Sequence, residues 1–510
     1  MSIFSNVAGM RTKKSKFNLS HERKLSLNMG ELIPIYLEEI VPGDNFKVNT
    51  ELLLRMSPLT APVMHRINVY THYFFVPNRI VWDNWESFIT GGKDGTEMPE
   101  HPQVVMNQVS KSLFTKGNLS DYFGLPTMDG FVGTDNQYVS GLPFRAYTEI
   151  YNEYYRDQNL TDAIEYDKTD GTAGLTEMQK ICAIRRRAWE KDYYTSALPW
   201  AQRGDTALIP TASGFRTEVT NLDGSEATTG AALQTQFISG GNQVGNTGLN
   251  IQGSGDPVNI VNEINVNDLR KSVRLQEWLE RSARGGSRYI EQILSHFGVR
   301  SSDARLQRPE FLGGGKNPVV ISEVLNTTGE TSENAGLPQG NMAGHGISVG
   351  RTNGFKKRFE EHGYVIGIMS VLPKATYQQG IEKPWTRTDK FDYYWPEFAQ
   401  LGEQEIMQNE IYADFDNIAT QEGTFGYQSR YAEYKYKCSS VHGDFRDNLS
   451  YWHLGRQFAN PPVLNQAFVE ADPDPRIFAV KDPGEDKLYA QIYNSVSAIR
   501  PMPYFNNPTL

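Results

Sequence analysis

Apolar and polar residues alternate over short stretches of this chain, which is the pattern of strands that bury one face. The stretch RINVYTHYFFVPNRIVWDNW at 66–85 shows this alternation most strongly. It predicts a strand that ends near Pro77, because proline cannot donate to a sheet ladder. Four of its residues are expected on one face, namely Val69, Thr71, Tyr73 and Phe75.

Other stretches repeat the strand pattern. Residues 31–58 predict two extended segments around a Pro-Gly turn, and the apolar run YVIGIMSVLP at 364–373 has the length of a buried strand. Further strands are expected in NPVVISEVLN at 317–326, YAEYKYKCSSVHGDF at 431–445 and YNSVSAIRPMPYF at 493–505. Many short strands between turn-forming stretches favour an antiparallel sandwich or jelly roll.

One helix is predicted at 144–159, in FRAYTEIYNEYYRDQN. Its apolar residues follow the i, i+3, i+4, i+7, i+8 spacing of a helical stripe. We interpret this stripe as core or as a contact between subunits, and a role in stacking on nucleic acid is less favoured. The stripe consists of Tyr147, Ile150, Tyr151, Tyr154 and Tyr155.

A pair of helices is predicted at 268–298, joined by Gly285-Gly286. Asn267 or Asp268 is expected to cap the first helix and Ser287 the second, and Gly298 is expected to end it. The apolar stripe of the second helix holds Ile290, Ile293, Leu294 and Phe297.

The Gly-Gly joint raises the question of anion binding. Arg281, Arg284 and Arg288 surround a helix start at Ser287, and such starts attract phosphate. We interpret Gly285, Gly286 and Ser287 as a structural joint in which one residue adopts a positive φ. Contact with a phosphate stays open as the alternative.

Residues 206–262 are polar, Gly-rich and without lasting periodicity. A loop this long inside a compact body is usually functional or disordered. We therefore expect a surface insertion.

The charge is uneven. The chain has a formal net charge of −10, yet residues 1–24 hold six cations against Glu22 alone. A basic arm on an acidic body is typical of a tail that contacts nucleic acid, and a solubilising tail is the alternative. The six candidates are Arg11, Lys13, Lys14, Lys16, Arg23 and Lys24.

Composition and the length of apolar runs add three constraints. The 26 Tyr and 25 Phe favour surfaces that are buried between subunits. Two cysteines, Cys182 and Cys438, cannot form a disulfide framework or a cysteine-rich metal site. No apolar run reaches the roughly 18 residues of a membrane span, so we expect a soluble protein assembled in a cytoplasm.

Candidate chemistry is weak throughout. The stretch LGGGKN at 312–317 lacks the spacing of a P-loop, and His65 and His72 are placed on opposite faces of a strand. Acidic pairs such as Glu403 with Glu405, or Glu360 with Glu361, are expected to lie in solvent and not to be the catalytic carboxylates of a glycosidase. A carbohydrate-binding or glycoside-hydrolysing β-sandwich stays the best rival, and it needs an exposed Trp or Tyr platform.

Five longer motifs lie between residues 78 and 446, namely NRIVWDNWESF, FRAYTEIYNEYYRDQNL, KDYYTSALPWAQRGD, ERSARGGSRYIEQILSHFGVRSSDARLQRPEFLGGG and FGYQSRYAEYKYKCSSVHGDFR. In this order they resemble blocks of the major capsid protein of microviruses, in the gokushovirus-like branch. The long ARGG block is the most specific of these. The chain is identified from them as a member of that family.

The resemblance implies a mainly β fold, a single eight-stranded antiparallel jelly roll over 31–510 with long loop insertions that contain a few helices. It implies a T=1 icosahedral shell around the circular single-stranded DNA of a tailless bacteriophage. It also implies no catalytic residue, cofactor or metal site. The arm at 1–30 is expected inside and the insertion at 206–262 outside, as a protrusion at the threefold axes that contacts the host.

The implied partners are copies of the chain, the packaged genome, a small basic internal protein, a pilot protein and a bacterial receptor. The expected location is the virion, assembled in the cytoplasm of the host.

Overall fold

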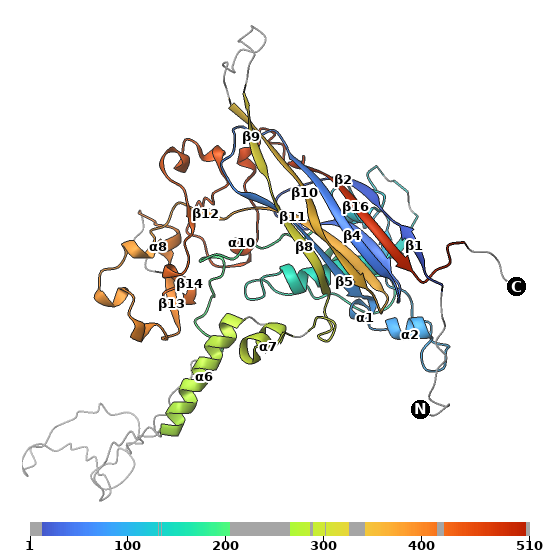
Figure 1. The fold of residues 1–510 in the computed structure, drawn as a ribbon, viewed down its shortest axis with the longest axis horizontal. Helices are drawn as coiled ribbons and strands as arrows, with labels where there is room; N and C mark the ends of the chain where they lie inside the picture. Colours follow the sequence, from blue (N-terminus) through green and yellow to red (C-terminus); the bar gives the residue numbers. More distant parts are fainter. Residues whose placement is uncertain are drawn as a thin grey trace, which may run out of the picture. The chain divides into compact units, whose positions relative to one another are not determined.

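The computed structural model describes residues 13–130, 132–133, 135–204, 266–285, 289–300, 302–325, 342–415 and 423–505. Contacts divide the chain into two units, Met1–Ala201 with Ala283–Leu510, and Gln202–Ser282. The first unit is built on two antiparallel sheets, and consecutive strands of the chain pass between them (Figure 1).

The larger sheet has six strands in the order β1-β16-β4-β10-β9, with β2 also paired to β16. Its strands are β1 (Ser15–Asn18), β2 (His21–Leu27), β4 (Asn45–Met56), β9 (Val320–Leu325), β10 (Met342–Arg358) and β16 (Leu488–Arg500). Residues 15–27 of the expected basic arm are therefore paired strands of this sheet.

The smaller sheet has four strands in the order β3-β11-β5-β8. They are β3 (Ile33–Ile40), β5 (Ile67–Pro77), β8 (Glu310–Pro318) and β11 (Gly363–Pro373). Three two-stranded ladders join β6 (Gln103–Met106) to β7 (Gln137–Ser140), β12 (Thr376–Tyr377) to β15 (Ser439–Ser440), and β13 (Glu403–Met407) to β14 (Thr424–Ser429).

Helices lie in the connections between strands. The α-helices are α1 (Asn78–Val81), α2 (Trp85–Thr90), α3 (Leu119–Phe123), α4 (Leu142–Ile150), α5 (Leu175–Ile181), α6 (Val266–Gly285), α7 (Tyr289–Phe297), α8 (Gln408–Ile411) and α10 (Gln466–Val469). A π-helix, η3 (Tyr151–Tyr155), continues α4. The short 3₁₀ helices are η2 (Lys111–Leu113), η4 (Lys383–Trp385), η5 (Lys390–Asp392), η6 (Pro396–Phe398), η7 (Ala432–Tyr434), η8 (Gly443–Arg446), η9 (Ser450–Trp452) and η10 (Pro475–Ile477).

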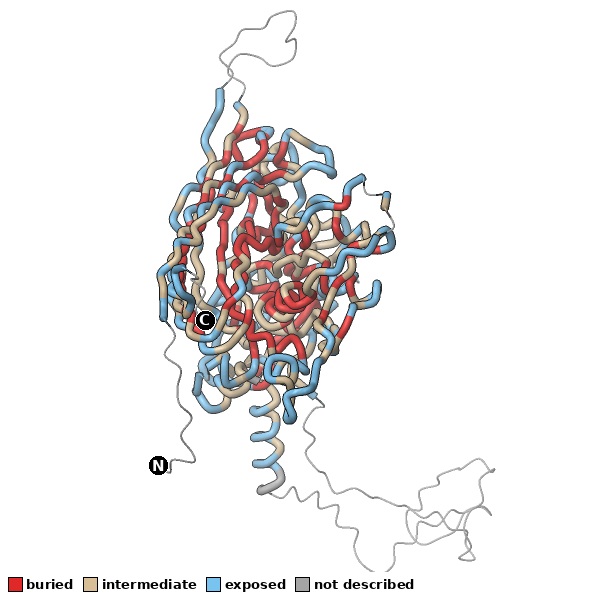
Figure 2. Tube along the Cα trace, turned by 90° about the vertical axis from the view of Figure 1, so that its right-hand side faces the viewer, coloured by how far each residue is buried: buried red, intermediate tan, exposed pale blue. Residues whose placement is uncertain are grey.

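The apolar core lies between the two sheets, and Figure 2 shows it as the buried interior of the tube. Leu52 and Leu54 of β4 and Ile492 of β16 share one cluster with Val69 of β5 and Val371 of β11. Each strand contributes alternate residues, because successive side chains point to opposite faces. The two sheets therefore pack face to face.

A small network of buried polar groups links the two sheets through this core. The Thr50 hydroxyl donates to the Asn494 Oδ1 at 2.8 Å and also contacts the Tyr73 hydroxyl. The Asn494 amide donates to the carbonyl of Ile35 at 3.1 Å. Ile35 is the extra residue at the bulge in β3, since Tyr36 and Pro34 on either side of it pair with Gly367 and Ile368. Asn494 thus satisfies a backbone carbonyl that lies at the bulge.

The other face of the smaller sheet is covered by helices. Phe74 of β5 and Ile366 of β11 share a core cluster with Phe144 and Tyr147 of α4 and Phe123 of α3. Strand β5 is buried on both faces as a result. The alternation at 66–85 had predicted a strand with only one buried face. The second covering layer explains why this stretch is so uniformly apolar.

The aromatic stripe predicted at 144–159 is confirmed as core, over a helix that ends at Tyr155. Tyr147 is fully buried and donates to the carbonyl of Leu32 at 2.9 Å, and Tyr154 donates to the carbonyl of Pro309 at 2.6 Å. Because the stripe packs within its own chain, it is not a surface for subunit contact.

Most of the other strand predictions are confirmed, and one is wrong. The turn within 31–58 and the strands at 317–326, 364–373 and 493–500 are confirmed. The strand predicted at 431–445 is wrong, since this stretch forms η7, the short β15 and η8. Its backbone turns at once, with Tyr431 at a φ of 60°, and its rings pack on neighbouring turns instead of on a sheet.

The Gly-rich stretch at 312–317 is part of β8. Gly314 lies opposite His72 of β5, where a Cβ atom would stand 2.5 Å from the His72 ring and 2.8 Å from the carbonyl oxygen of Thr71. The glycine therefore permits close packing of a strand rather than phosphate binding.

We expect Asn494→Ala to lower the free energy of unfolding by about 3 kcal/mol, because the bulge carbonyl and the Thr50 hydroxyl lose their partner inside the core. Gln491→Ala, on the exposed face of the same strand, should change it by less than about 0.5 kcal/mol. Chemical denaturation of the purified chain measures both values. Equal losses in the two variants would contradict the role of Asn494.

We expect Gly314→Ala to cost about 1–3 kcal/mol through overpacking. The matched variant is Gly174→Ala, where a Cβ atom meets nothing within 4 Å and the φ is −68°. Thermal unfolding of the two proteins gives the comparison. A Gly314→Ala protein as stable as Gly174→Ala would show that β8 can move away from β5.

Candidate nucleic-acid interface

The face of the larger sheet that points away from the core, which we call its outer face, carries rows of basic side chains. Strand alternation places Lys47 on the face opposite to Phe46 and Val48, which are buried in the core. Lys47 pairs directly with Lys356 of β10. Like charges that face each other across a ladder repel, so this position needs a counter-charge from outside the sheet.

A second row lies beside the first. Lys16 of β1 pairs with Ile499 of β16, Ile499 pairs with Asn45 of β4, and Asn45 pairs with Arg358 of β10. Both ends of this row are exposed cations. The two rows together span four strands of the sheet.

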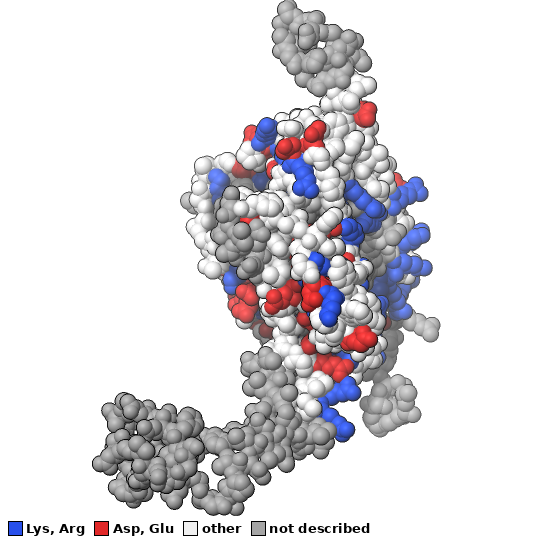
Figure 3. Space-filling view, turned by 90° about the vertical axis from the view of Figure 1, so that its left-hand side faces the viewer, with Lys and Arg blue, Asp and Glu red and all other residues white. Residues whose placement is uncertain are grey.

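The whole outer face has a strong excess of positive charge. On β1, β2, β4, β10 and β16, the exposed outward side chains include seven cations and two carboxylates. Figure 3 shows lysines and arginines gathered along its right-hand edge, which is the front of Figure 1, where these strands lie. The cations are Lys16, Lys24, Lys47, Arg55, Arg351, Lys356 and Arg358, and the carboxylates are Glu22 and Glu51.

One ion pair reduces the charge within this face. Arg351 Nε lies 2.9 Å from Glu51 Oε1, and the Arg351 side chain stays 85% exposed. A chain with a formal charge of −10 therefore presents a face with a net positive charge. Such a face attracts a polyanion over the distance of a Debye length.

Two tyrosines lie among the cations. Tyr489 and Tyr493 alternate with buried residues of β16 and are 46% and 39% exposed. Tyr489 pairs with Arg55 and Tyr493 with Glu51. Exposed rings beside cations suit stacking of unpaired bases, which is how sequence-independent surfaces hold single strands.

The predicted arm residues divide between two sides of the sheet. Lys16 and Lys24 belong to the basic face, while Lys13 and Lys14 precede it and the Lys14 ammonium lies 3.5 Å from the carbonyl of Gly43. Arg11 lies outside the described residues.

Arg23 points the other way. It donates to the carbonyl of Tyr122 at 2.8 Å, and burial lowers the pKa of its guanidinium. It lines a hollow of about 370 Å³ beside β2, together with Lys24, Lys116 and Tyr122. The structure therefore separates Arg23 from the outward row of cations.

Sequence reasoning missed five cations of this face, namely Lys47, Arg55, Arg351, Lys356 and Arg358. The alternation of Lys47 and Arg55 with apolar residues in 45–56 was a readable signal for an exposed basic strand face. The pairing of β4 with β10, which brings Lys356 beside Lys47, has no signal in the local sequence.

Gly285 itself is required for close packing, and the positive φ expected for the residue after the first helix concerns Gly286 and stays a prediction. Gly285 ends α6 without a positive φ, and a Cβ atom there would stand 2.5 Å from the Ser295 Oγ and 2.6 Å from its Cβ. Gly285 thus permits close approach of α7. Gly286 and Ser287 lie outside the described residues, as does Arg288.

The other predictions for this helical pair have mixed outcomes. Helix α6 begins at Val266, two residues before the expected start at 268, so Asn267 and Asp268 lie within its first turn. Gly298, at a φ of 70°, donates to the carbonyl of Leu294 at 3.0 Å and ends α7 as predicted.

The arginines near the joint are already paired. Arg284 forms an ion pair with Glu403 and donates to the carbonyl of Gly402 at 2.9 Å. Within the unit Gln202–Ser282, Arg281 lies 3.4 Å from Glu277 on the same helix. These carboxylates supply the counter-charge that a phosphate would otherwise supply.

Carboxylates considered for glycosidase chemistry are engaged in the same way. Glu403 pairs with Arg284, Glu361 with Arg79, and Glu405 accepts a hydrogen bond from the Thr424 hydroxyl at 3.2 Å. The His65 ring hydrogen-bonds to the carbonyl of Lys374, and the His72 ring hydrogen-bonds to the hydroxyl of Tyr155. Among the described residues, no group of three or more His, Cys, Asp or Glu is placed to hold a metal ion.

Cys182 and Cys438 are free thiols, and burial raises the pKa of each to about 12. Over the described part of the chain, no helix has the length and hydropathy to cross a membrane.

Comparison with known proteins gives consistent relatives. The family described as "Capsid protein (F protein)" matches residues 5–510. The chain is 35% identical to capsid protein VP1 of Chlamydia phage 1, 36% to capsid protein VP1 of Bdellovibrio phage phiMH2K and 32% to capsid protein VP1 of Spiroplasma virus 4. Each comparison covers 99% of this chain and 97% of the relative.

The resemblance seen in the sequence motifs is thus confirmed over nearly the full length, and a structural, non-enzymatic role is what this family implies. The chain belongs to the phage capsid protein F family, as a microvirus capsid protein, and is part of the virion.

Proposed function

We propose that this protein forms an icosahedral T=1 shell that encloses single-stranded DNA, with the outer face of the larger sheet directed at the genome. The observation that carries the proposal is the excess of outward cations on that face in a chain of net charge −10. Lysine and arginine neutralise phosphates without reading bases, which suits a genome of any sequence. Tyr489 and Tyr493 add stacking on unpaired bases.

We also propose that eight strands form a viral jelly roll. Strands β2, β16, β4 and β10 would make one half and β3, β11, β5 and β8 the other. The support is that β2, β3, β4 and β5 alternate between the two sheets along the chain, as do β10, β11 and β16. Strands β1 and β9 are additions at the edges of the larger sheet.

The arm expected at 1–30 is proposed to face the genome, and its described strands support this orientation. Strands β1 and β2 pair with β16, so they extend the basic face with Lys16 and Lys24. Contacts with a small basic internal protein and a pilot protein stay predictions from the resemblance, as does assembly in the cytoplasm of the host.

The insertion at 206–262 lies outside the described residues. Its polar, Gly-rich sequence and its place after LPWAQRGD favour a protrusion on the outer surface that contacts a bacterial receptor. This role stays part of the proposal.

A carbohydrate-active sandwich is the alternative function. The ion pairs of Glu403 and Glu361 leave those carboxylates committed to arginines, which disfavours the hydrolytic form. The alternative predicts binding of glycans by single chains, whereas the shell predicts particles.

We expect the triple variant Lys47→Gln, Lys356→Gln, Arg358→Gln to bind single-stranded DNA about tenfold or more weakly, and to lower the salt slope of binding by about 2, since each lost phosphate contact removes about 0.7. Fluorescence anisotropy with a labelled oligothymidylate, titrated at several salt concentrations, measures both.

The matched control removes the same charge elsewhere. Lys93, Lys435 and Lys481 are exposed and lie outside the two large sheets, so their change to Gln should leave the slope near the wild-type value. Equal effects of the two triple variants would show that total charge, and not this face, determines binding.

We expect particles whose residues 215–260 are replaced by a short Gly-Ser linker to assemble and to attach poorly to the host. Electron microscopy checks assembly, and adsorption assays check attachment. Failure to assemble would make the insertion an assembly element, and normal infection would place the receptor contact elsewhere.

A further inference from the structure

A second surface of the protein is rich in exposed aromatic rings, and we call it the aromatic surface. Its residues come from the turns at 385–395 and from 434–436, in the part of the chain that lies between β12 and β15. They are 45–81% exposed, which is unusual for so many large rings in one region. The aromatic surface consists of Trp385, Phe391, Tyr393, Tyr394, Trp395, Tyr434 and Tyr436.

The rings are held in fixed positions. The Tyr394 amide donates to the Tyr434 hydroxyl at 3.3 Å, and the two ring centroids lie 6.1 Å apart. The Trp395 amide donates to the Tyr431 hydroxyl at 3.3 Å, and the Trp395 indole donates to the carbonyl of Lys390 at 2.9 Å. Binding through this surface would cost little side-chain entropy, because the rings are already ordered.

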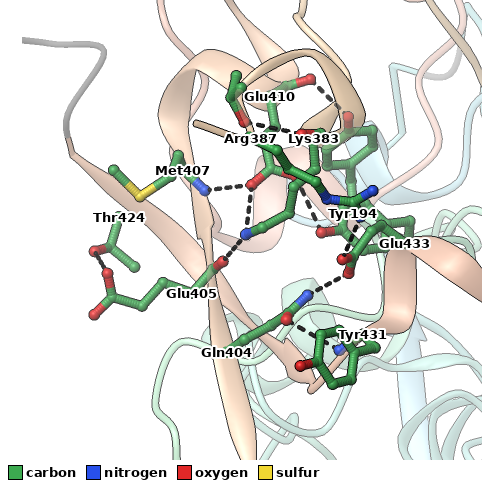
Figure 4. Close-up of polar contacts among 12 residues, drawn as sticks. Tyr194, Lys383, Arg387, Gln404, Glu405, Met407, Glu410, Thr424, Tyr431 and Glu433 are labelled. Atoms are coloured by element: carbon green, nitrogen blue, oxygen red, sulfur yellow. Dashed lines mark hydrogen bonds and ion pairs between the residues drawn. The ribbon is translucent and has the colours of Figure 1, made fainter. Parts of the chain in front are cut away.

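A buried ion pair contacts one of these rings, and Figure 4 shows its two members, Arg387 and Glu433. Arg387 lies 2.9 Å from Glu433, and both side chains are 7% exposed. The Arg387 guanidinium lies 4.4 Å from the centroid of the Tyr434 ring. Gln404 donates to the second oxygen of Glu433 at 2.6 Å. The Arg387–Glu433 pair adds no net charge to the aromatic surface.

Hydrogen bonds also hold the turn that carries Phe391. The Asp392 carboxylate accepts from the amides of Thr388 and Asp389 at 2.9 and 2.8 Å. The Asp389 carboxylate accepts from the amide of Lys390 at 2.6 Å. The rings are therefore presented on a fixed backbone, and aromatic-rich surfaces of this kind are typical of contacts between proteins.

The size of the surface also fits a protein partner. Each aromatic side chain offers up to about 150–250 Å², so seven half-exposed rings present roughly 700 Å². A standard interface buries about 800 Å² on each partner and is enriched in Tyr, Trp and Phe. Capsid proteins assemble into multimeric shells, so the neighbour present at the highest local concentration is another copy of this chain.

We infer that the aromatic surface packs against a second copy of the chain in the shell. The inference rests on the proposed shell and identifies one of its contact surfaces. Trp385, 81% exposed, and Tyr436, 56% exposed, are the two most exposed members of the aromatic surface.

The test is the double variant Trp385→Ala, Tyr436→Ala in particles and in purified chains. Sedimentation should show a concentration for assembly at least tenfold higher than that of the wild type, with an unchanged melting temperature of the unassembled chain. The control is Met98→Ala, Val109→Ala, which removes side chains that are 92% and 69% exposed elsewhere and should assemble as the wild type does. Assembly of the aromatic variant at the wild-type concentration, or equal weakening in the control, would overturn the inference.

A second measurement does not depend on a mutation. Hydroxyl-radical labelling of virions should find Trp385 and Tyr436 protected at least fivefold relative to the dissociated chain, and protected equally in shells emptied of DNA. Full labelling of both residues in virions overturns the inference and leaves the proposed shell intact. If the proposed DNA face is wrong, the triple variant Lys47→Gln, Lys356→Gln, Arg358→Gln binds DNA as the wild type does, while the protection of Trp385 and Tyr436 persists. The two failures are therefore distinguishable.

Discussion

The pairing of β16 with β4 and with the N-terminal strands β1 and β2 is the constraint on which the rest of the structure depends. This strand of 13 residues lies between β4 on one side and β1 with β2 on the other. Thr50 and Asn494, which meet in the core, are 444 positions apart in the sequence. Until β16 is in place, β1 and β2 have no partner strand in the larger sheet and the core between the sheets stays open. Folding therefore depends on contacts of very long range, which form slowly.

The same strand gives the two faces of the sheet their separate roles. Because side chains alternate, Ile492 and Val496 lie in the core while Tyr489 and Tyr493 lie on the outer face. Strand β4 does the same with Phe46 inside and Lys47 outside. An acidic protein can thus keep a basic face, since the alternation fixes which residues meet solvent. Three layers result, an outer basic face, a core between the sheets, and a layer of helices beyond the second sheet.

Local patterns were sufficient for many elements and misleading for a few. The run at 364–373 is a buried strand because its length and composition leave no other way to bury it. The stretch at 431–445 alternates equally well, but it has no long strand beside it and its rings pack on neighbouring turns, so it forms short helices. The stripe on α4 has the spacing of a surface contact and of a core helix alike. Only the fold decides that Phe74 lies opposite and buries it.

By itself the sequence determined the class of fold, the family and the cations at 13–24, because these depend on local periodicity, motifs and composition. Tertiary structure alone decided which cations act together. Lys47 and Lys356 are neighbours through strand pairing, and Arg23 leaves the group because it lies on the opposite face of β2 from Lys24. The aromatic surface was likewise unreadable, since Tyr434 and Tyr394 meet only through turns. The physical reason is that periodicity reports which face a residue shares with its sequence neighbours, whereas a binding surface is made by neighbours in space.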